Sequence, residues 1–311
     1  MIHSTPGIDE VERQRALDAL HIVGSLPEPA YDDIVKVAAA VCGTPMALVT
    51  LIDRDRQWFK ARTGVDGVQT ERNMAVCDHA IRQPDELMEV GDLSSDARFA
   101  QNPLLKDIGA RFYAGMPLVT TEGAAVGAVC VLDLNPRELN ATQRDALQAL
   151  ARITMRLMEG RSREHDQQVT SLLEDAVAQE GTGAPSTAGA YTVVILELQD
   201  LTELAQRVGD RSLDRQLAQL DQVLDRCLQP ERGDSINRVT GSGEFIAVLG
   251  SDEAADTLAR FEQVAQETRQ ALGVPLLLGA ASTSTAEATS AVFLRADQAL
   301  SAAKDARRVS Q

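Results

Sequence analysis

The stretch 140–179 contains no proline and is rich in Gln, Arg, Leu, Ala and Glu, which are good helix formers. Its length corresponds to roughly eleven turns of α-helix. Asn140 stands three residues before Gln143, a spacing that allows the two side chains to cap the start of a helix reciprocally. We therefore expect a connecting helix over 140–180, so that the chain before it and the chain after it fold as separate blocks.

Two apolar stripes run along this predicted helix, and the polar residues 159–168 separate them. The first stripe comprises Leu147, Leu150, Ile153, Leu157 and Met158, and the second comprises Val169, Leu172, Leu173 and Ala176. We expect the first stripe to pack on the N-terminal block. The second stripe has the spacing of a short coiled coil, so it predicts that two copies of the chain meet there in a homodimer.

A run of small residues follows the predicted helix. Residues 181–189 read GTGAPSTAG, a composition typical of a flexible linker. The 311 residues of the chain are enough for two domains of ordinary size. The sequence thus predicts an N-terminal domain over 8–160, which shares the start of the helix, and a C-terminal domain over 190–309.

Hydrophobic periodicity predicts the helices and strands of both blocks. In the N-terminal block, helices are expected at 9–20 and 29–42 and strands at 46–53, 56–62, 87–90, 113–119 and 126–133. In the C-terminal block, strands are expected at 193–198, 236–240, 245–249 and 276–281, and helices at 201–208, 213–228, 254–272 and 291–306. This order predicts an α+β domain, in which helices pack on an antiparallel sheet, followed by an α/β sandwich.

Charge and hydropathy limit the partners of the chain. The net charge is −16 and no strong run of Lys or Arg occurs, whereas binding of nucleic acid requires clustered basic residues that neutralise phosphates. Nucleic acid and anionic membrane surfaces are therefore not expected partners. The first ten residues lack an apolar run, and no apolar run approaches the ~20 residues that cross a bilayer. We expect a cytoplasmic protein.

The N-terminal block resembles bacterial GAF domains over nearly all of residues 8–160. The matching segments, in order, are 52–60 (IDRDRQWFK), 72–81 (RNMAVCDHAI), 92–102, 111–118 (RFYAGMPL) and 127–133 (GAVCVLD). This resemblance implies a pocket between the sheet and the surrounding loops that binds a small molecule, or a role in dimerisation.

The candidates for such a sensor pocket are aromatic and basic side chains close to the matching segments. They are Trp58, Phe59, Arg72, Cys77, His79, Arg111 and Tyr113. A few orienting polar groups among aromatic residues suit a small-molecule pocket. In the alternative interpretation, the aromatic residues, with Phe112, only build the core of the sheet.

Cys77 and His79 raise the question of a metal or haem site. On an extended segment both side chains would point the same way, but on the helix that we expect there they turn apart. The four cysteines of the chain are scattered, without a CxxC pair, which argues against a zinc site or a redox dithiol. A packed thiol and a hydrogen-bonded imidazole are therefore expected, and no metal. A redox-sensing role of Cys77 would require an exposed thiol.

The C-terminal block resembles a GGDEF domain, the nucleotide-cyclase-type fold of bacterial diguanylate cyclases. The matching segments are 208–214 (VGDRSLD), 238–249 (RVTGSGEFIAVL) and 295–304 (RADQALSAAK). The resemblance implies a site where two divalent cations, held by carboxylates, assist the attack of a 3′-hydroxyl on an α-phosphate.

The chain departs from that pattern at several positions. Where the family has an Asp at the end of the first strand, this chain has Glu197. The third position of the name-giving motif, which is acidic in the family, is Gly243, and the acid at the next position is Glu244. Ala205 stands for the Asn that contacts guanine and Leu201-Thr202 for a Phe-Lys pair, while Asp214 and Lys304 match the family. The sequence therefore predicts a degenerate site without catalytic residues, at which Asp214 contributes to weak nucleotide binding.

Three functions agree with these residues. The first is a non-catalytic signalling regulator that senses an unidentified small molecule, contacts another signalling protein and needs no cofactor. The second is a divergent diguanylate cyclase that uses Mg²⁺ with Glu197 and Glu244. The third is an enzyme similar to free methionine sulfoxide reductases, which use cysteines of a GAF domain. The lack of a cysteine cluster in the sequence argues against the third.

Overall fold

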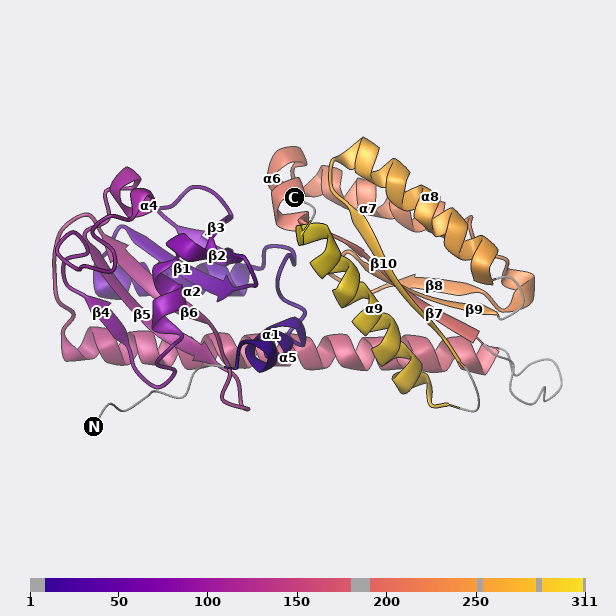
Figure 1. Cartoon of the computed structure of the whole chain (residues 1–311), viewed down its shortest axis with the longest axis horizontal. Helices are drawn as coiled ribbons and strands as arrows, with labels where there is room; N and C mark the ends of the chain where they lie inside the picture. Colours follow the sequence, from indigo (N-terminus) through magenta and orange to yellow (C-terminus); the bar gives the residue numbers. More distant parts are fainter. Residues whose placement is uncertain (1–8, 180–190, 251–253, 284–286, 310–311) are drawn as a thin grey trace. The chain divides into compact units, whose positions relative to one another are not determined.

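The computed structural model describes residues 9–179, 191–250, 254–283 and 287–309 (Figure 1). The chain divides into two compact units. The N-terminal unit comprises Met1–Val23 and Pro27–Arg163, and the C-terminal unit comprises Gly24–Leu26 and Glu164–Gln311. The expected linker at 181–189 lies outside the described residues.

A six-stranded antiparallel sheet forms the centre of the N-terminal unit, in the order β3-β2-β1-β6-β5-β4. Its strands are β1 (Met46–Ile52), β2 (Arg56–Thr63), β3 (Gln69–Glu71), β4 (Met88–Val90), β5 (Phe112–Val119) and β6 (Ala125–Asp133). β1 and β6 are buried along their whole length, as their continuous apolar sequences predict. β3, which is only three residues long, was not predicted.

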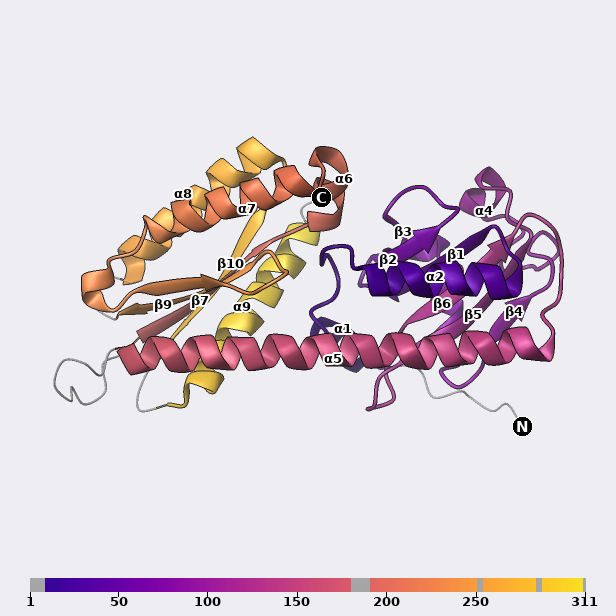
Figure 2. The same ribbon diagram turned by 180° about the vertical axis from the view of Figure 1, so that it is seen from behind.

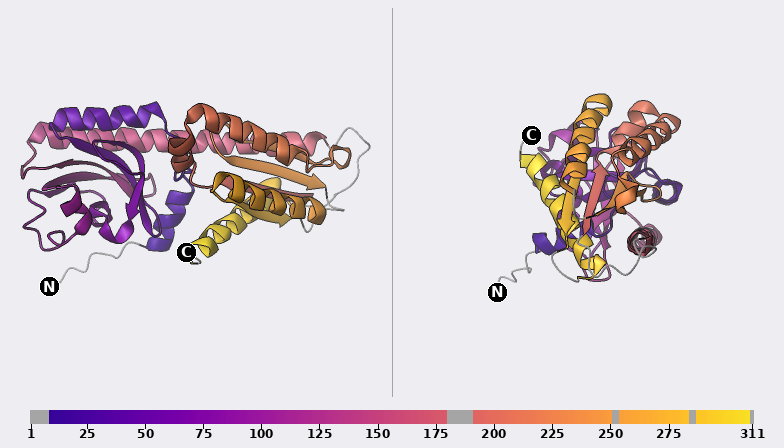
Figure 3. Two further views of the ribbon diagram at one scale, coloured as in Figure 1. Left: turned by 90° about the horizontal axis from the view of Figure 1, so that it is seen from above. Right: turned by 90° about the vertical axis from the view of Figure 1, so that its right-hand side faces the viewer.

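Helices cover both faces of this sheet. They are α1 (Glu10–Asp18), α2 (Pro29–Cys42), the 3-10 turn η1 (Arg72–Met74), α3 (Val76–Ala80), α4 (Pro103–Asp107) and the start of α5 (Ala141–Gln179). Figures 2 and 3 show α2 and the first half of α5 side by side on one face. Pro29 at the first turn and the left-handed Gly43 after the last set the bounds of α2 as predicted. The short helices α3 and α4 lie on the other face.

The predicted connecting helix is the element α5. Asn140 and Gln143 cap its start reciprocally, with backbone-to-side-chain distances of 2.9 and 3.0 Å. Leu147, Leu150 and Met158 of the first stripe are buried in the core between the sheet and α2, as expected. Ile153 and Leu157 differ from the prediction, because they remain 48% and 37% exposed.

The second stripe of α5 contradicts the expectation that it is available for a copy of the chain. Val169 and Leu173 are buried in a core within the C-terminal unit, together with residues of its sheet and its last helix. Gln168 adds a reciprocal pair of hydrogen bonds with Thr240, of 2.8 and 3.2 Å. Sequence periodicity indicates an apolar stripe but does not identify the surface that covers it. The second half of α5, from Glu164 onward, therefore belongs to the C-terminal unit, ahead of the expected start at residue 190.

The C-terminal unit contains a four-stranded antiparallel sheet in the order β10-β7-β9-β8. Its elements are β7 (Tyr191–Leu198), α6 (Leu201–Val208), α7 (Asp210–Asp225), the 3-10 turn η3 (Pro230–Arg232), β8 (Ser235–Arg238), β9 (Glu244–Gly250), α8 (Ala254–Leu272), β10 (Leu276–Ser282) and α9 (Thr289–Val309). Helices α6, α7 and α8 share a core with one face of this sheet. Helix α9 and the second half of α5 cover the other face. The predicted fold class, with helices packed on antiparallel sheets in both units, is confirmed. Among the described residues, no helix is both long enough and apolar enough to cross a bilayer.

Candidate functional site

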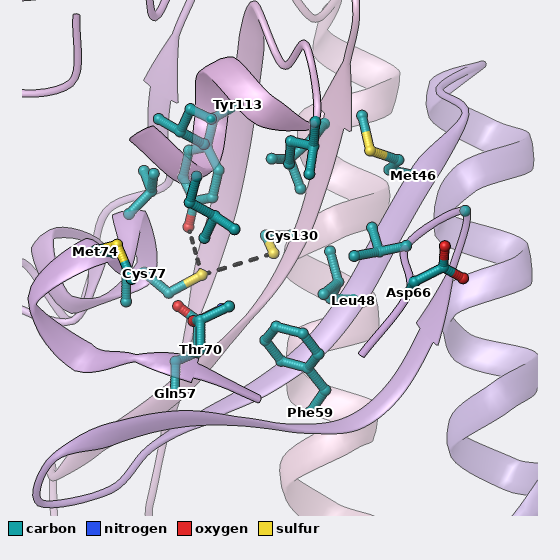
Figure 4. A pocket seen from close by; sticks show the side chains of 18 of the residues that line it. Met46, Leu48, Gln57, Phe59, Asp66, Thr70, Met74, Cys77, Tyr113 and Cys130 are labelled. Atoms are coloured by element: carbon teal, nitrogen blue, oxygen red, sulfur yellow. Dashed lines mark hydrogen bonds between the residues drawn. The ribbon is translucent and has the colours of Figure 1, made fainter. Parts of the chain in front are cut away.

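The N-terminal unit encloses a cavity of about 420 Å³ between its sheet and the segments that carry α3 and α4 (Figure 4). The lining is mostly apolar and includes Met46, Leu48, Phe59, Met74 and Ile108. A mostly apolar cavity with a few polar groups is typical of small-molecule sites.

Strand alternation decides which of the predicted aromatic residues reach this cavity. Phe59 on β2 and Tyr113 on β5 line it, whereas their neighbours Trp58 and Phe112 point to the opposite face and pack in the core beneath α2. Trp58, which was expected in the pocket, therefore lies in the core instead. Because successive side chains of a strand alternate, only one of each pair can enter the cavity.

The three predicted basic residues do not line the cavity either. Arg72 bridges Glu10 and Asp78 at 2.5 and 2.7 Å, and Arg111 holds Asp92 at 2.7 Å. His79 contacts the edge of the Phe99 ring, with ring centres 4.9 Å apart, and burial lowers the pKa of its imidazole. Arg72 thereby connects α1 to α3, and all three residues have partners within the N-terminal unit. Of the seven candidates, the structure brings Phe59, Cys77 and Tyr113 together at the cavity.

Two polar side chains that the sequence did not single out lie in the cavity wall. Gln57 on β2 and Thr70 on β3 are direct cross-strand partners. Gln57 is only 7% exposed, and neither its Oε1 atom nor Thr70 Oγ1 finds a hydrogen-bond partner among the described residues. Buried polar atoms are normally satisfied, so this pair of acceptors suits a ligand that donates a hydrogen bond.

The cavity wall also holds two cysteines in contact. Sγ of Cys77 on α3 lies 3.7 Å from Sγ of Cys130 on β6, and the Tyr113 hydroxyl donates to Cys77 Sγ at 3.2 Å (Figure 4). The cysteines are scattered along the sequence, but the fold brings this pair together. Helix α3 turns His79 away from the pair, as predicted. Cysteines that are distant in the sequence can therefore meet in the wall of this cavity.

The two thiols differ electrostatically. The hydrogen bond with Cys130, followed by those with Thr50 and Tyr113, lowers the pKa of Cys77 despite its burial. The same contact with Cys77, together with burial, raises the pKa of Cys130 well above its usual value. Cys77 is therefore the thiol of this pair that more readily becomes a thiolate.

In the C-terminal unit, the motif GSGEF at 241–245 connects β8 to β9. A Cβ atom at Gly243 would lie 2.7 Å from Cδ1 of Leu201 and 3.2 Å from Cβ of Leu198. Apolar side chains thus occupy the position that an acidic side chain would need at the third place of the motif.

The two remaining acids of the predicted site lie opposite each other. Glu197 on β7 and Glu244 on β9 are cross-strand partners, so both side chains leave the same face of the sheet. Glu197 Oε2 is 2.5 Å from Nζ of Lys304, and Glu244 Oε2 is 2.7 Å from Nε2 of His165 on α5. Burial opposes ionisation of His165, but hydrogen bonding and attraction to Glu244 and Asp166 raise its pKa overall.

These residues do not fit a pair of Mg²⁺ ions. Divalent cations need several carboxylate oxygens at one place, and here each of the two carboxylates contacts a basic side chain. The guanine-binding position is also altered, because Ala205 is buried in the core while Asp214 is exposed on α7. A second cavity of about 430 Å³, between α7 and β8, is lined by Asp221, Arg238 and Phe245, and Asp214 is not among its lining residues.

The chain matches known families in both units. Residues 27–156 match the GAF domain family, and residues 168–310 match the family described as diguanylate cyclase, GGDEF domain. A cyclic di-GMP phosphodiesterase of Pseudomonas aeruginosa is 35% identical to this chain over 201 residues, or 63% of the chain. The chain spans 34%, about a third, of the length of that relative.

Two solved structures are similar to parts of the chain. The GGDEF domain of DgcB from Caulobacter crescentus, in complex with c-di-GMP, has a TM-score of 0.36 and 19% identity, over 45% of this chain and 84% of that one. The GAF domain from the Acinetobacter phosphoenolpyruvate-protein phosphotransferase has a TM-score of 0.36 and 16% identity, over 48% of this chain and 92% of that one. By its two family matches, this chain carries a GAF domain at residues 27–156 followed by a GGDEF domain at residues 168–310.

Proposed function

We propose that this chain is a non-catalytic, cytoplasmic regulator of cyclic di-GMP signalling, in which the GAF domain senses a small molecule and the GGDEF domain contacts another signalling protein or binds a nucleotide weakly. The observation that carries the proposal is the position of Leu201. Its Cδ1 atom lies 2.7 Å from where a Cβ atom of Gly243 would be, in the space of the missing acid.

The electrostatics of the remaining acids support the same conclusion. Lys304 and His165 each contact one of the two carboxylates that face each other across β7 and β9. To hold a cation, each carboxylate would have to exchange a basic partner for the ion. Loss of a metal-binding carboxylate at a two-metal site costs several kcal/mol of transition-state stabilisation, and about 1.4 kcal/mol corresponds to a tenfold change in rate.

The cavity of the GAF domain supports the sensing role. Its wall is largely apolar, and Gln57 Oε1 and Thr70 Oγ1 offer two acceptors without partners among the described residues. A small, mainly apolar molecule with a hydrogen-bond donor fits this chemistry. We further propose that the chain acts as a homodimer.

One observation favours a second candidate, a divergent diguanylate cyclase. Glu197 and Glu244 are direct cross-strand partners, so one face of the sheet carries both carboxylates. If Lys304 and His165 turned away, the two acids could approach one cation. The two candidates therefore differ in whether the full chain turns over GTP.

The deciding experiment is to incubate the purified full chain with GTP and Mg²⁺ and to measure cyclic di-GMP by chromatography and mass spectrometry. We expect no product above the blank without protein, and the same result for Glu197→Gln. Production of cyclic di-GMP by the wild type that disappears in Glu197→Gln would overturn the proposal and establish the cyclase.

Thermal unfolding with GTP, cyclic di-GMP and cyclic nucleotides, each with and without Mg²⁺, tests binding separately. A ligand that binds the folded state raises the unfolding temperature by mass action. Trp58, the only tryptophan, is 3% exposed in the core of the N-terminal unit, so its fluorescence reports ligands of the GAF domain. Ligands of the GGDEF domain shift the transition seen by circular dichroism.

A further inference from the structure

Cys77 and Cys130 form a dithiol whose sulfur atoms are 3.7 Å apart. A disulfide has an S–S distance of about 2.05 Å, so the two atoms would need to approach by about 1.7 Å. Cys77 belongs to the five-residue helix α3, which lies in a loop region, while Cys130 is fixed in the central strand β6. The short helix α3, at the cavity wall, would therefore make this movement.

The cavity gives small reagents a route to these thiols. Cys77 is 2% exposed and Cys130 is 1% exposed, so neither reaches bulk solvent directly, but both line the cavity of about 420 Å³. A hydroperoxide as small as hydrogen peroxide fits in that space.

The surroundings assign different roles to the two sulfurs. The Tyr113 hydroxyl donates a hydrogen bond to Cys77 at 3.2 Å and thereby stabilises negative charge on that sulfur. Gly115 makes this contact possible, because a Cβ atom there would lie within the space of the Tyr113 hydroxyl. Thiolates are the nucleophilic form of cysteine, so Cys77 is the attacking residue and Cys130 is the resolving one.

We propose that the cavity of the GAF domain is a redox modification site, at which a small hydroperoxide converts Cys77 and Cys130 into a reversible disulfide.

In the first step, the Cys77 sulfur attacks one oxygen of the hydroperoxide. The O–O bond breaks, Cys77 becomes a sulfenic acid, and the other oxygen leaves as water or an alcohol after taking the proton of the Cys77 thiol. In the second step, the Cys130 sulfur attacks the Cys77 sulfur, the S–O bond breaks, and the hydroxyl leaves as water with the Cys130 proton. The two thiols lose two electrons and two protons, and the hydroperoxide gains them.

Formation of this bond changes the sensor pocket. In the disulfide, Cys77 is no longer a thiolate that accepts the hydrogen bond of Tyr113. Helix α3 moves toward β6, and with it Val76, which also lines the cavity. Thiol oxidation therefore changes a wall of the same cavity that would bind the ligand. This oxidation does not depend on whether the GGDEF domain is catalytic.

The test uses the reduced full chain, treated with a small molar excess of hydrogen peroxide at neutral pH without metal ions. After denaturation, the remaining thiols are alkylated, and peptides are mapped by mass spectrometry without reduction. We expect the number of alkylated cysteines to fall from four to two, with residues 77 and 130 linked in one peptide pair. Dithiothreitol restores all four.

Variants separate the two steps. Cys130→Ser is expected to accumulate a sulfenic acid at Cys77 that dimedone traps, and Cys77→Ser to lose the reaction. Cys42→Ser is the matched control, because Cys42 is another buried cysteine of the same unit, and it should still form the 77–130 link. If Trp58 fluorescence shows that Cys130→Ser does not fold, the presence or absence of the 77–130 disulfide in the oxidised wild type decides whether the proposal holds. Retention of four thiols in the folded wild type, or a disulfide between other cysteines, overturns the proposal.

Discussion

At the scale of single residues, Lys60 carries a charge into the interior of the GAF domain. It lies at a β-bulge of β2, where the pairing with β1 passes from Val49–Ala61 to Thr50–Phe59. Its side chain is fully buried, with Nζ 2.7 Å from Glu28 Oε1 and 4.9 Å from the centre of the Tyr31 ring. Burial, only partly offset by attraction to Glu28, lowers the pKa of Lys60 from 10.5 to about 8.

This pKa predicts a specific dependence of stability on pH. Below pH 8 the ammonium group is charged in both states and burial opposes folding. Between pH 8 and 10.5 the folded state loses the proton while the unfolded state keeps it, so the free energy of unfolding rises with pH. Relative to Lys60→Met, the wild type should gain on the order of 2 kcal/mol between pH 7 and pH 10. Urea unfolding followed by Trp58 fluorescence measures the difference.

The matched control is Lys36→Met, because Lys36 on α2 has a side chain that is 68% exposed. Its difference from the wild type should stay flat across the same pH range. A flat difference for Lys60→Met as well would mean that the Lys60 ammonium is not desolvated in the folded protein.

At the scale of elements, the second half of α5 is part of the core of the GGDEF domain. Leu173→Ala removes a side chain that is 4% exposed among residues of the sheet and of α9. We expect a loss of about 2–4 kcal/mol of stability in the C-terminal unit, since buried Leu→Ala changes leave a cavity. Hydrogen exchange of peptides from β7 and β9 measures this loss as reduced protection.

Leu172→Ala is the neighbouring control, because Leu172 is only partly buried against the same core. Its effect should be clearly smaller. Equal protection of β9 in the wild type and in Leu173→Ala would show that residues 164–175 do not fold cooperatively with this domain.

The helices were the most predictable elements, because local signals set their ends. Helix α8 covers the predicted residues, and α5 begins where Asn140 and Gln143 cap each other. Strand β3 escaped prediction because three residues carry too little periodicity. The contact of the second α5 stripe with the GGDEF sheet could not be predicted, since a stripe does not specify its partner.

The candidate sites were less predictable than the fold. The absence of an acid at Gly243 can be seen in the sequence, but the presence of Leu201 in that space is a tertiary fact. Alternation along β2 and β5 could have separated Phe59 from Trp58 and Tyr113 from Phe112. The approach of Cys130 to Cys77 joins residues 53 positions apart, and periodicity alone does not provide that contact.

At the scale of the whole molecule, the proposed homodimer needs an apolar surface. In the N-terminal unit, the neighbouring helices α2 and α5 expose Val37 (48%), Val41 (41%), Ile153 (48%) and Leu157 (37%). We expect Ile153→Lys combined with Leu157→Lys to weaken the dimer by at least about tenfold in dissociation constant, or about 1.4 kcal/mol, because two charges would enter an apolar contact. Light scattering across a concentration series measures the mass.

The control for this pair is Val223→Lys, because Val223 on α7 has the same exposure of 37% but belongs to the other unit. It should leave the mass unchanged. A wild-type chain that stays monomeric at all concentrations would contradict the proposed dimer. If the α5 changes leave the dimer intact, the dimer interface lies on another surface of the chain.

The discontinuity of the C-terminal unit has a practical consequence for protein engineering. A fragment that starts near residue 190, after the glycine-rich stretch 181–189, would lack Val169 and Leu173. One face of the sheet of the GGDEF domain would then be exposed. The same fragment would lack Ser25, whose carbonyl oxygen accepts a 2.8 Å hydrogen bond from Thr202. Chimaeras that graft a foreign receptor onto this output should therefore splice inside the long helix, ahead of Glu164, and supply a substitute for the three residues Gly24–Leu26.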